Sequence, residues 1–172
     1  MGRKRFDQMS CSVAQALEVL GDWWTLLIVR EAFFGTRRFS DFSRHLGLAK
    51  NTLSDRLSHL VENGILERVD SGKTGTRYEY RLTAKGHDLL PVLTALRQWS
   101  DEWVYGEGAE PTIVRDRATG RRLPKMVPRD VEGRELSSRD LFAEPGPGAD
   151  DELRQRFEVA WRRRIERRAQ AG

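Results

Sequence analysis

Only one cysteine, Cys11, occurs among the 172 residues. A single thiol forms no disulfide within its own chain, and it leaves a cysteine-based zinc site without ligands. The three histidines, at positions 45, 59 and 87, do not have the spacing to acidic neighbours that metal sites use. The sequence therefore predicts no bound metal and no other cofactor.

Long apolar runs are also absent. No segment approaches the roughly eighteen apolar residues of a membrane-spanning helix. The first ten residues, MGRKRFDQMS, are partly basic but are not followed by the apolar stretch of a signal peptide. Since 38% of the residues are hydrophobic, the chain can fill one core, and we expect a cytoplasmic globular protein.

The residue groups that catalysis needs are missing as well. We find no nucleophile paired with a base, no carboxylate pair, no metal cluster and no phosphate-binding loop. Ser58 and His59 are neighbours in a predicted helix, so their side chains diverge by about 100° and form no catalytic pair. The sequence therefore predicts a protein that is not an enzyme.

The net charge of +4 gives little information about a partner, because it is unevenly distributed. Residues 11–105 hold 12 basic and 12 acidic side chains, whereas the excess lies in the first ten residues and after residue 105. Local charge is more informative. The stretch 37–56 is positive, with Arg37, Arg38, Arg44, Lys50 and Arg56 against Asp41 and Asp55.

Helical patterns fill the first part of the chain. Asp22 and Ser40 are predicted to cap the second and third helices, because their side-chain oxygens accept the free amides of a first turn. Gly64 is predicted to end the fourth helix in the left-handed conformation. The second helix, WWTLLIVREAFF, is apolar on nearly every side and should be the buried central element. The predicted helices cover residues 13–20, 23–34, 41–46 and 50–63.

The period then changes to that of strands. ILERV and RYEYRL flank a polar turn with glycine and predict a β-hairpin with a long tip. Thr83 should cap a long helix that Pro91 kinks, since proline removes one backbone donor and crowds the preceding turn. The apolar stripe of this helix is more extensive than a monomer needs. It consists of Leu89, Leu93, Leu96, Trp99 and Trp103.

After residue 106 the pattern favours short strands joined at Gly120 and Gly133, then a linker rich in proline and glycine. The last helix, DDELRQRFEVAWRRRIERR, has acids at its start and arginines at its end, which suits the helix dipole. Its arginines could bind nucleic acid or an acidic partner, or the helix could pack on the surface. The apolar stripe that favours packing consists of Leu153, Phe157, Trp161 and Ile165.

Three helices, a hairpin and a further helix are the order of a winged helix-turn-helix domain, in which one helix enters the major groove. The helix at 50–63 turns Leu53, Leu57 and Leu60 inward and leaves a polar face that suits DNA. Lys50 and Arg56 suit phosphate or guanine, and Asn51 suits adenine. The alternatives are a merely solvated face, or a winged helix that contacts protein. The predicted DNA-binding residues are Arg38, Ser40, Lys50, Asn51, Thr52, Ser54, Asp55, Arg56, Lys73 and Arg77.

We therefore expect a mainly α fold with a small β-hairpin, a winged helix-turn-helix, followed by a C-terminal extension with short strands and a terminal helix. The predicted divisions are a basic arm at 1–10, a domain for DNA binding and dimerisation at 11–105, the extension and linker at 106–148, and the helix at 149–172.

Residues 11–105 resemble the HxlR-type transcription regulators, relatives of the MarR group. The resemblance implies a sequence-specific regulator, a repressor, that forms a homodimer through its first and last core helices and binds inverted-repeat operators in double-stranded DNA. Ser12 stands where the family often has proline, and the extension has no cysteines and so cannot bind zinc. The motifs are Cys11, Gly21 with Trp24, RFSDF at 38–42, TLSDRL at 52–57, Gly64, and YEYRLTAKG at 78–86.

In that family, a cysteine at the position of Cys11 can sense oxidants or electrophiles. A nearby helix N-terminus and the basic residues 3–5 would favour the thiolate. The alternative is a small residue buried under the dimer interface. A non-covalent small ligand is another possible effector. Its pocket would be lined by aromatic residues that could equally be core: Trp23, Trp24, Phe33, Phe34, Trp99 and Trp103.

Overall fold

The computed structural model describes residues 6, 8–73 and 76–170, without the side chains of 73, 76, 77 and 164–170. The chain divides into two compact units. One comprises residues 19–127, and the other comprises residues 1–18 together with 128–172. The helix α1 (Ser12–Leu20) crosses from one unit into the other.

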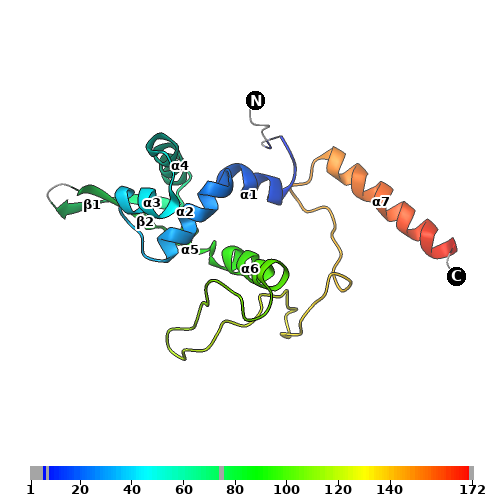
Figure 1. Ribbon diagram of the computed structural model, residues 1–172. Coiled ribbons are helices and arrows are strands. Elements are labelled where there is room, and N and C mark those ends of the chain that lie inside the picture. The colour runs from blue at the N-terminus through cyan, green and yellow to red at the C-terminus, as the bar shows by residue number, and fades with distance from the viewer. Residues whose placement is uncertain (1–5, 7, 74–75, 171–172) are drawn as a thin grey trace. The chain divides into compact units, whose positions relative to one another are not determined.

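The unit 19–127 contains the helix-turn-helix and the wing, seen in Figure 1. Three helices precede an antiparallel hairpin, and a short helix and a long helix follow it. Its elements are α2 (Trp23–Phe33), α3 (Phe39–Leu46), α4 (Lys50–Glu62), β1 (Leu66–Lys73), β2 (Thr76–Leu82), α5 (Ala84–His87), α6 (Leu90–Ser100) and the π-helical turn η1 (Asp101–Tyr105).

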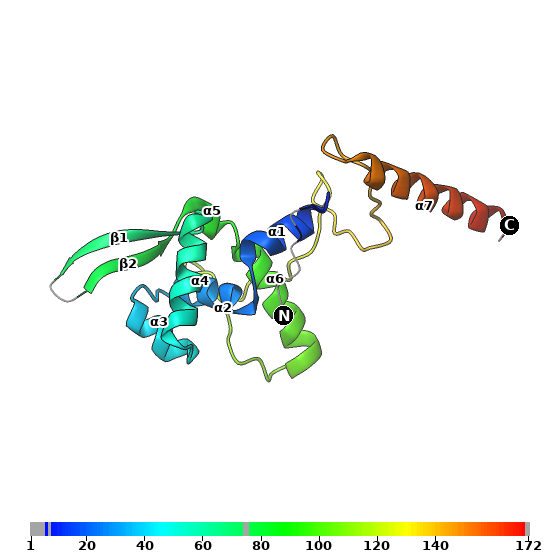
Figure 2. The same ribbon diagram turned by 90° about the horizontal axis from the view of Figure 1, so that it is seen from above.

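The core of this unit lies between α2, α3 and α4, whose arrangement Figure 2 shows from above. Ile28 of α2 and Phe42 of α3 are fully buried, as are the three leucines of α4. Burying a side chain of this size contributes about 1.5–3 kcal/mol. The inward leucines therefore fix which face of α4 points away from the protein.

The prediction that α2 is the buried central element is only partly correct. Asp22 caps the helix as predicted, because its Oδ1 accepts from the amide of Thr25 at 3.3 Å. Ile28 and Val29 are buried, whereas Trp23 is 84% exposed and Phe34 also faces solvent. The middle of α2 is therefore buried, whereas Trp23 at its start and Phe34 just after its end are not.

The prediction that Ser40 caps α3 is wrong. The helix begins at Phe39, two residues before the predicted start, and Arg38 occupies the capping position without a side-chain hydrogen bond. Ser40 therefore lies inside the first turn. Gly64 has the predicted left-handed conformation, with φ of 67°.

The wing is a two-stranded antiparallel sheet in which Leu66 pairs with Leu82 and Asp70 with Tyr78. Thr83 caps α5 as predicted, since its hydroxyl accepts from the amide of Gly86 at 3.1 Å. The predicted kink at Pro91 is instead a break. The chain leaves the helix after His87 and begins α6 with Pro91 in its first turn, where the missing proline donor costs nothing.

The stripe on α6 differs from the predicted one by a small rotation. Leu89 and Leu93 pack against the core of their own chain. The predicted Leu96, Trp99 and Trp103 are exposed, the last two at 58% and 70%, and Val92 joins them. Residues 92, 96 and 99 of α6, with residue 103 of η1, are called the exposed α6 stripe below.

Two turns of the C-terminal extension lie where short strands were predicted. Arg115 and Arg122 form a single antiparallel bridge around Gly120 in the first unit, and Arg129 and Glu135 form another around Gly133 in the second. Neither bridge extends into a longer strand. The predicted terminal helix is α7 (Asp151–Gln170).

In the part of the chain that is described, no single helix is long and apolar enough to cross a membrane. Only as a pair, bent by 74°, do Ser12–Leu20 and Trp23–Phe33 reach that length and composition.

Candidate DNA-binding surface

The turn between α3 and α4 sets the position of the surface. Gly47 ends α3 with φ of 64°, and its amide donates to the carbonyl of Ser43 at 3.0 Å. Glycine adopts the left-handed conformation without a steric penalty, so the chain can turn from α3 into α4 within three residues. Leu48 then inserts its side chain into the core. Gly47, which ends α3, and Leu48, which packs in the core, therefore together hold α4 beside α3.

The outer face of α4 gathers most of the predicted DNA-binding residues. Lys50, Asn51, Ser54 and Asp55 are exposed, whereas Thr52 is half-buried. The helix itself has no side-chain cap at Ala49. Amides of its first turn therefore lie beside Lys50 and Asn51, where a phosphate could accept from them.

Arg56 is held by an ion pair within the protein. Its Nη2 lies 2.7 Å from Oδ2 of Asp22, and both side chains are partly buried. Asp22 uses its other oxygen, Oδ1, to cap α2. One carboxylate thus joins the start of α2 to the middle of α4, which fixes the position of α4 against the core.

A second carboxylate, Glu31 of α2, connects α2 to α3. Its Oε1 accepts from Arg30 at 2.8 Å, and its Oε2 lies 3.2 Å from the hydroxyl of Thr36 and 3.0 Å from Nδ1 of His45. Burial raises the pKa of the Glu31 carboxyl, but hydrogen bonds from Arg30, His45 and Thr36 outweigh that effect, so the pKa lies below its ordinary value of 4.5. Sequence reasoning did not identify Glu31, because no local pattern shows that its carboxylate meets His45 of the next helix.

The hairpin projects beyond α3 and α4 (Figures 1 and 2). The amide of Tyr80 donates to the carbonyl of Arg37 at 2.8 Å, which attaches β2 to the segment before α3. Arg68 of β1 donates to Ser58 of α4 at 3.4 Å. The predicted wing contacts, Lys73 and Arg77, have side chains that lie outside the described residues.

The remaining predicted contacts lie at the start of α3. Arg38 is half-buried at the capping position, and Ser40 is exposed in the first turn. Next to them, Arg37 is exposed and was not among the predicted contacts. Its position in a run of two arginines before a helix is the sequence signal that could have identified it.

Cys11 directly precedes α1. Cys11 is exposed in the single chain, and its carbonyl accepts a hydrogen bond from the amide of Gln15, in the first turn of α1, at 3.0 Å. The basic residues 3–5, which were expected to favour the thiolate, lie outside the described residues. No group of three or more potential metal ligands gathers in the part of the chain that is described.

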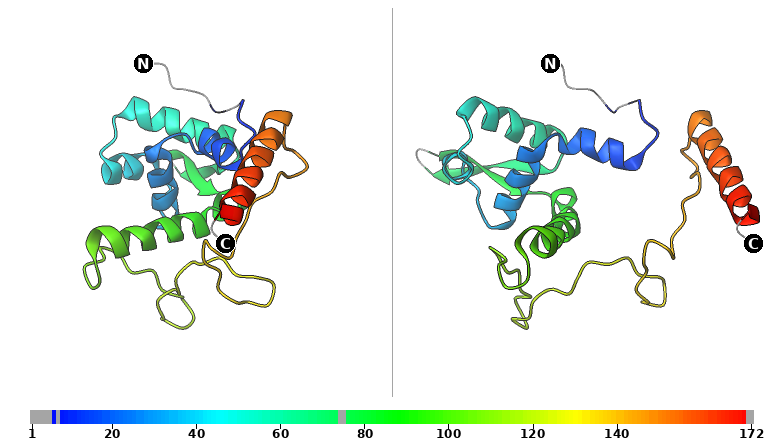
Figure 3. Two further views of the ribbon diagram at one scale, coloured as in Figure 1. Left: turned by 90° about the vertical axis from the view of Figure 1, so that its right-hand side faces the viewer. Right: turned by 45° about the vertical axis from the view of Figure 1, so that its right-hand side comes forward.

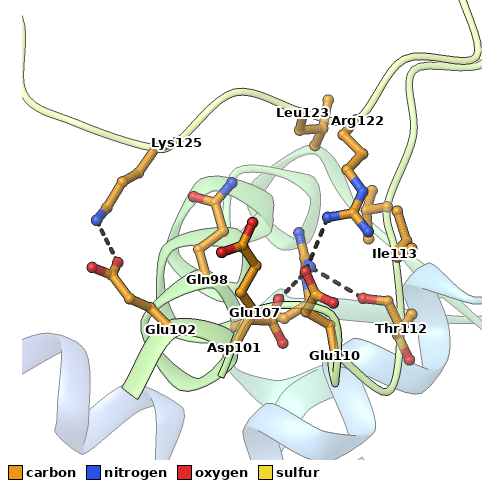
Figure 4. A pocket seen from close by; sticks show the side chains of 12 residues that line it. Gln98, Asp101, Glu102, Glu107, Glu110, Thr112, Ile113, Arg122, Leu123 and Lys125 are labelled. Carbon is orange, nitrogen blue, oxygen red and sulfur yellow. Dashed lines mark hydrogen bonds and ion pairs between the residues drawn. The ribbon is translucent and has the colours of Figure 1, made fainter. Parts of the chain in front are cut away.

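Two cavities adjoin α6. One of about 370 Å³ lies between α6, η1 and the segment 107–125, where Lys125 is paired with Glu102 and Arg122 with Glu110 at 2.9 Å (Figure 4). Its charged groups are thus largely used in internal pairs. The other cavity, of about 570 Å³, is mainly apolar and lies between α2 and α6, with Phe33, Phe34 and Glu31 in its wall.

The comparisons with known proteins agree with this architecture. Residues 19–107 match the family model described as the HxlR-like helix-turn-helix. The HTH-type transcriptional regulator Rv3095 of Mycobacterium tuberculosis is 44% identical over 138 residues, which is 80% of this chain and 87% of that protein.

Two solved structures are similar over most of the chain. The crystal structure of PA1607, a candidate transcription factor, has a TM-score of 0.76 and 39% identity, and the match covers 83% of this chain and 100% of that one. PA1374 from Pseudomonas aeruginosa, also a candidate transcription factor, has a TM-score of 0.59 and 38% identity, over 85% and 99% of the two chains. With its turn, outward-facing α4 and wing, the chain belongs to the HxlR-like helix-turn-helix family of DNA-binding transcription regulators.

Proposed function

We propose that this regulator is a homodimeric repressor without catalytic activity that binds an inverted-repeat operator in double-stranded DNA. The observation that supports this most is the polar outer face of α4, held by three buried leucines beside a projecting hairpin. A helix of this kind fits the major groove, where each base pair presents a distinct pattern of donors and acceptors.

In this proposal α4 reads bases and the wing contacts phosphates. Asn51 is suited to a bidentate contact with adenine, and Lys50 to guanine or phosphate. Arg56 would have to share its guanidinium between Asp22 and DNA. The full proposed contact set is Arg38, Ser40, Lys50, Asn51, Thr52, Ser54, Asp55 and Arg56 around the helix-turn-helix, and Lys73 and Arg77 on the wing.

The dimer would form through α1 and the exposed α6 stripe. Two exposed tryptophans at helical spacing are unusual on a monomer and typical of an interface. We assign DNA binding and dimerisation to residues 11–105, flanked by a basic arm at 1–10. The extension and linker at 106–148 and the helix at 149–172 then follow this domain.

A gel-shift assay with the DNA upstream of the protein's own gene tests the proposal. We expect a retarded band at nanomolar protein, and a footprint with two-fold symmetry. Binding of equal strength to every unrelated fragment would contradict sequence-specific recognition. If the protein bound no DNA but retained a protein partner through α4, the alternative role as a protein-interaction module would hold instead.

The proposed input is an electrophile that modifies Cys11, because the thiol is exposed at the start of α1. Electrophiles react with the thiolate form of an accessible cysteine. Modification at a helix of the proposed interface would change the relative position of the two α4 helices.

A non-covalent ligand is the second candidate input, and the cavity between α2 and α6 favours it. Cavities of this size with mainly apolar walls are typical of small-molecule sites. Glu31 lines the cavity and also contacts Thr36 and His45, so an occupant could affect α3 directly. A screen of aromatic compounds by thermal shift, followed by gel shift, would identify such a ligand. Compounds that raise the melting temperature without changing DNA affinity would count against an effector role.

A further inference from the structure

The C-terminal helix α7 has an apolar stripe that its own chain covers only in part. Leu153, Phe157 and Trp161 recur every four residues, on one side of the helix. The first two are half-buried, but Trp161 is 62% exposed. Phe157 and Trp161 line an open groove of about 450 Å³ beside residues 142–145. Figure 3 shows α7 as one uninterrupted helix, and a helix of 20 residues needs a packed face to be stable.

The charges of this segment are arranged symmetrically about Phe157. Counting outward, the acidic residues 150–152 lie at the same distances before Phe157 as the arginines 162–164 lie after it. Arg156 precedes Phe157 and Glu158 follows it, so the same reversal of sign holds next to the centre. The helix dipole accounts for acids at the start and arginines at the end, but not for this match in distance.

We propose that α7 packs against α7 of a second copy of this chain, antiparallel, with the two-fold axis at Phe157. The two Phe157 side chains then meet at the centre, and Leu153 of each copy lies level with Trp161 of the other. The acidic start of each helix lies beside the arginine-rich end of the other copy, which is attractive. A parallel pair would instead place arginines beside arginines.

The position of α7 relative to α1 also supports pairing with a second copy of the chain. The hydroxyl of Ser10 donates to the carbonyl of Gly148 and accepts from the amide of Asp150, both at 3.4 Å. Ser10 lies two residues before α1, so α7 begins next to a helix of the proposed dimer interface. The inference rests on the proposed homodimer and extends it by a second pair of helices.

Cross-linking of the full-length chain tests the register. In a Cys11→Ser background, a cysteine is introduced singly at position 157, 153, 161 or 155, and the protein is oxidised with copper phenanthroline. We expect a disulfide-linked dimer for Phe157→Cys alone, because its Cβ atoms meet on the axis. Residues 153 of the two copies would be about 12 Å apart along the helices, as would residues 161. These single variants should not cross-link, but a mixture of Leu153→Cys and Trp161→Cys should.

The control is Gln155→Cys, on the opposite side of the helix, which should not cross-link. Links in the single variants at 153 and 161, as well as at 157, would indicate a parallel pair and overturn the proposal, because each residue then lies level with its own copy. Light scattering separates the possible failures. A monomeric mass for the unmodified protein refutes the homodimer itself, whereas a dimeric mass without a link at 157 refutes only the pairing of α7.

Charge reversal gives a second measurement that leaves the apolar stripe intact. Asp151→Arg with Glu152→Arg should weaken dimerisation several-fold, and so should Arg162→Glu with Arg163→Glu. Combining all four changes should restore it, because the signs again match in the antiparallel pair. If the arginine changes instead weakened DNA binding and its salt dependence without changing dimerisation or cross-linking, these arginines would contact DNA and the proposal would be wrong.

Discussion

Two carboxylates, Asp22 and Glu31, each connect α2 to another helix of the helix-turn-helix. Asp22 caps α2 with one oxygen and pairs with Arg56 of α4 through the other. Glu31 connects α2 to Thr36 and to His45 of α3. At the scale of residues, the helix-turn-helix is therefore positioned by polar contacts as well as by its apolar core.

Replacing Glu31 by glutamine should destabilise the protein by about 1–2 kcal/mol at neutral pH, because hydrogen bonds to a charged group are lost. The effect stays modest because Arg30 and His45 are half-exposed, so that water screens their interaction with the carboxylate. The folded-state pKa of Glu31 is lowered, so its contribution is complete above about 4.5 and is lost as the pH falls through the lower folded value. Urea unfolding at fixed protein concentration should therefore show the native and variant proteins converging below pH 4.5. Glu62→Gln, at an exposed position of α4, is the control and should change little.

Cys11 gives the second prediction at this scale. Diamide or a quinone should lower operator affinity in the native protein and leave a Cys11→Ser variant unaffected, because only a thiolate reacts at an appreciable rate. Gel shifts before and after treatment measure the difference. Slow labelling of the folded dimer together with unchanged affinity would remove the sensor role and favour a non-covalent ligand.

At the scale of elements, α4 and the wing should have different roles. Asn51→Ala should relax preference at particular base pairs, at a cost of about 1–3 kcal/mol if the contact is bidentate. Lys73→Ala or Arg77→Ala should weaken binding to all sequences alike and lower the salt slope by about one per lost phosphate contact. Competition gel shifts at several salt concentrations measure both effects. Wing variants that changed sequence preference, with α4 variants that did not, would reverse the assignment. Arg56→Ala is less informative, because it also breaks the ion pair with Asp22.

The packing of α5 against the wing depends on one glycine. A Cβ atom on Gly86 would lie 2.3 Å from the carbonyl oxygen of Ile65 and 3.0 Å from Cδ2 of Leu82. Because the nearest atom belongs to the backbone, Gly86→Ala should destabilise the protein by about 1–3 kcal/mol. Gly146→Ala, where nothing lies within 4 Å, should be nearly neutral. Equal unfolding midpoints for the two variants would contradict the close contact.

At the scale of the whole molecule, the exposed α6 stripe should decide whether the protein binds an operator at all. A dimer would place two α4 helices about one helical turn of DNA apart, roughly 34 Å, and so require a two-fold symmetric site. Leu96→Asp or Trp99→Glu should give a monomeric mass by light scattering and abolish operator binding, with helix content unchanged by circular dichroism. Asp88→Lys, an exposed change just before α6, should remain dimeric. A monomeric native protein at micromolar concentration would contradict the proposal.

Local signals in the sequence determined most of the elements. The leucines of α4, the cap at Asp22, the left-handed Gly64 and the alternation of β2 each depend on neighbours a few residues away. Such short-range preferences can be recognised in the sequence without a structure. The same holds for the family motifs, which is why the fold class and the helix-turn-helix were predicted correctly.

Only the tertiary structure decided contacts between distant segments. The sequence contains no sign that Arg56 pairs with Asp22, that Glu31 contacts His45, or that the carbonyl of Ile65 leaves room only for glycine at position 86. Ser40 and Pro91 were misjudged for a related reason. Several residues near each helix start could begin the helix, and packing of Phe39 and Leu89 against the core selects among them. The exposed stripe on α6 differs from the predicted one for the same physical reason, because Leu89 and Leu93 pack against the core of their own chain.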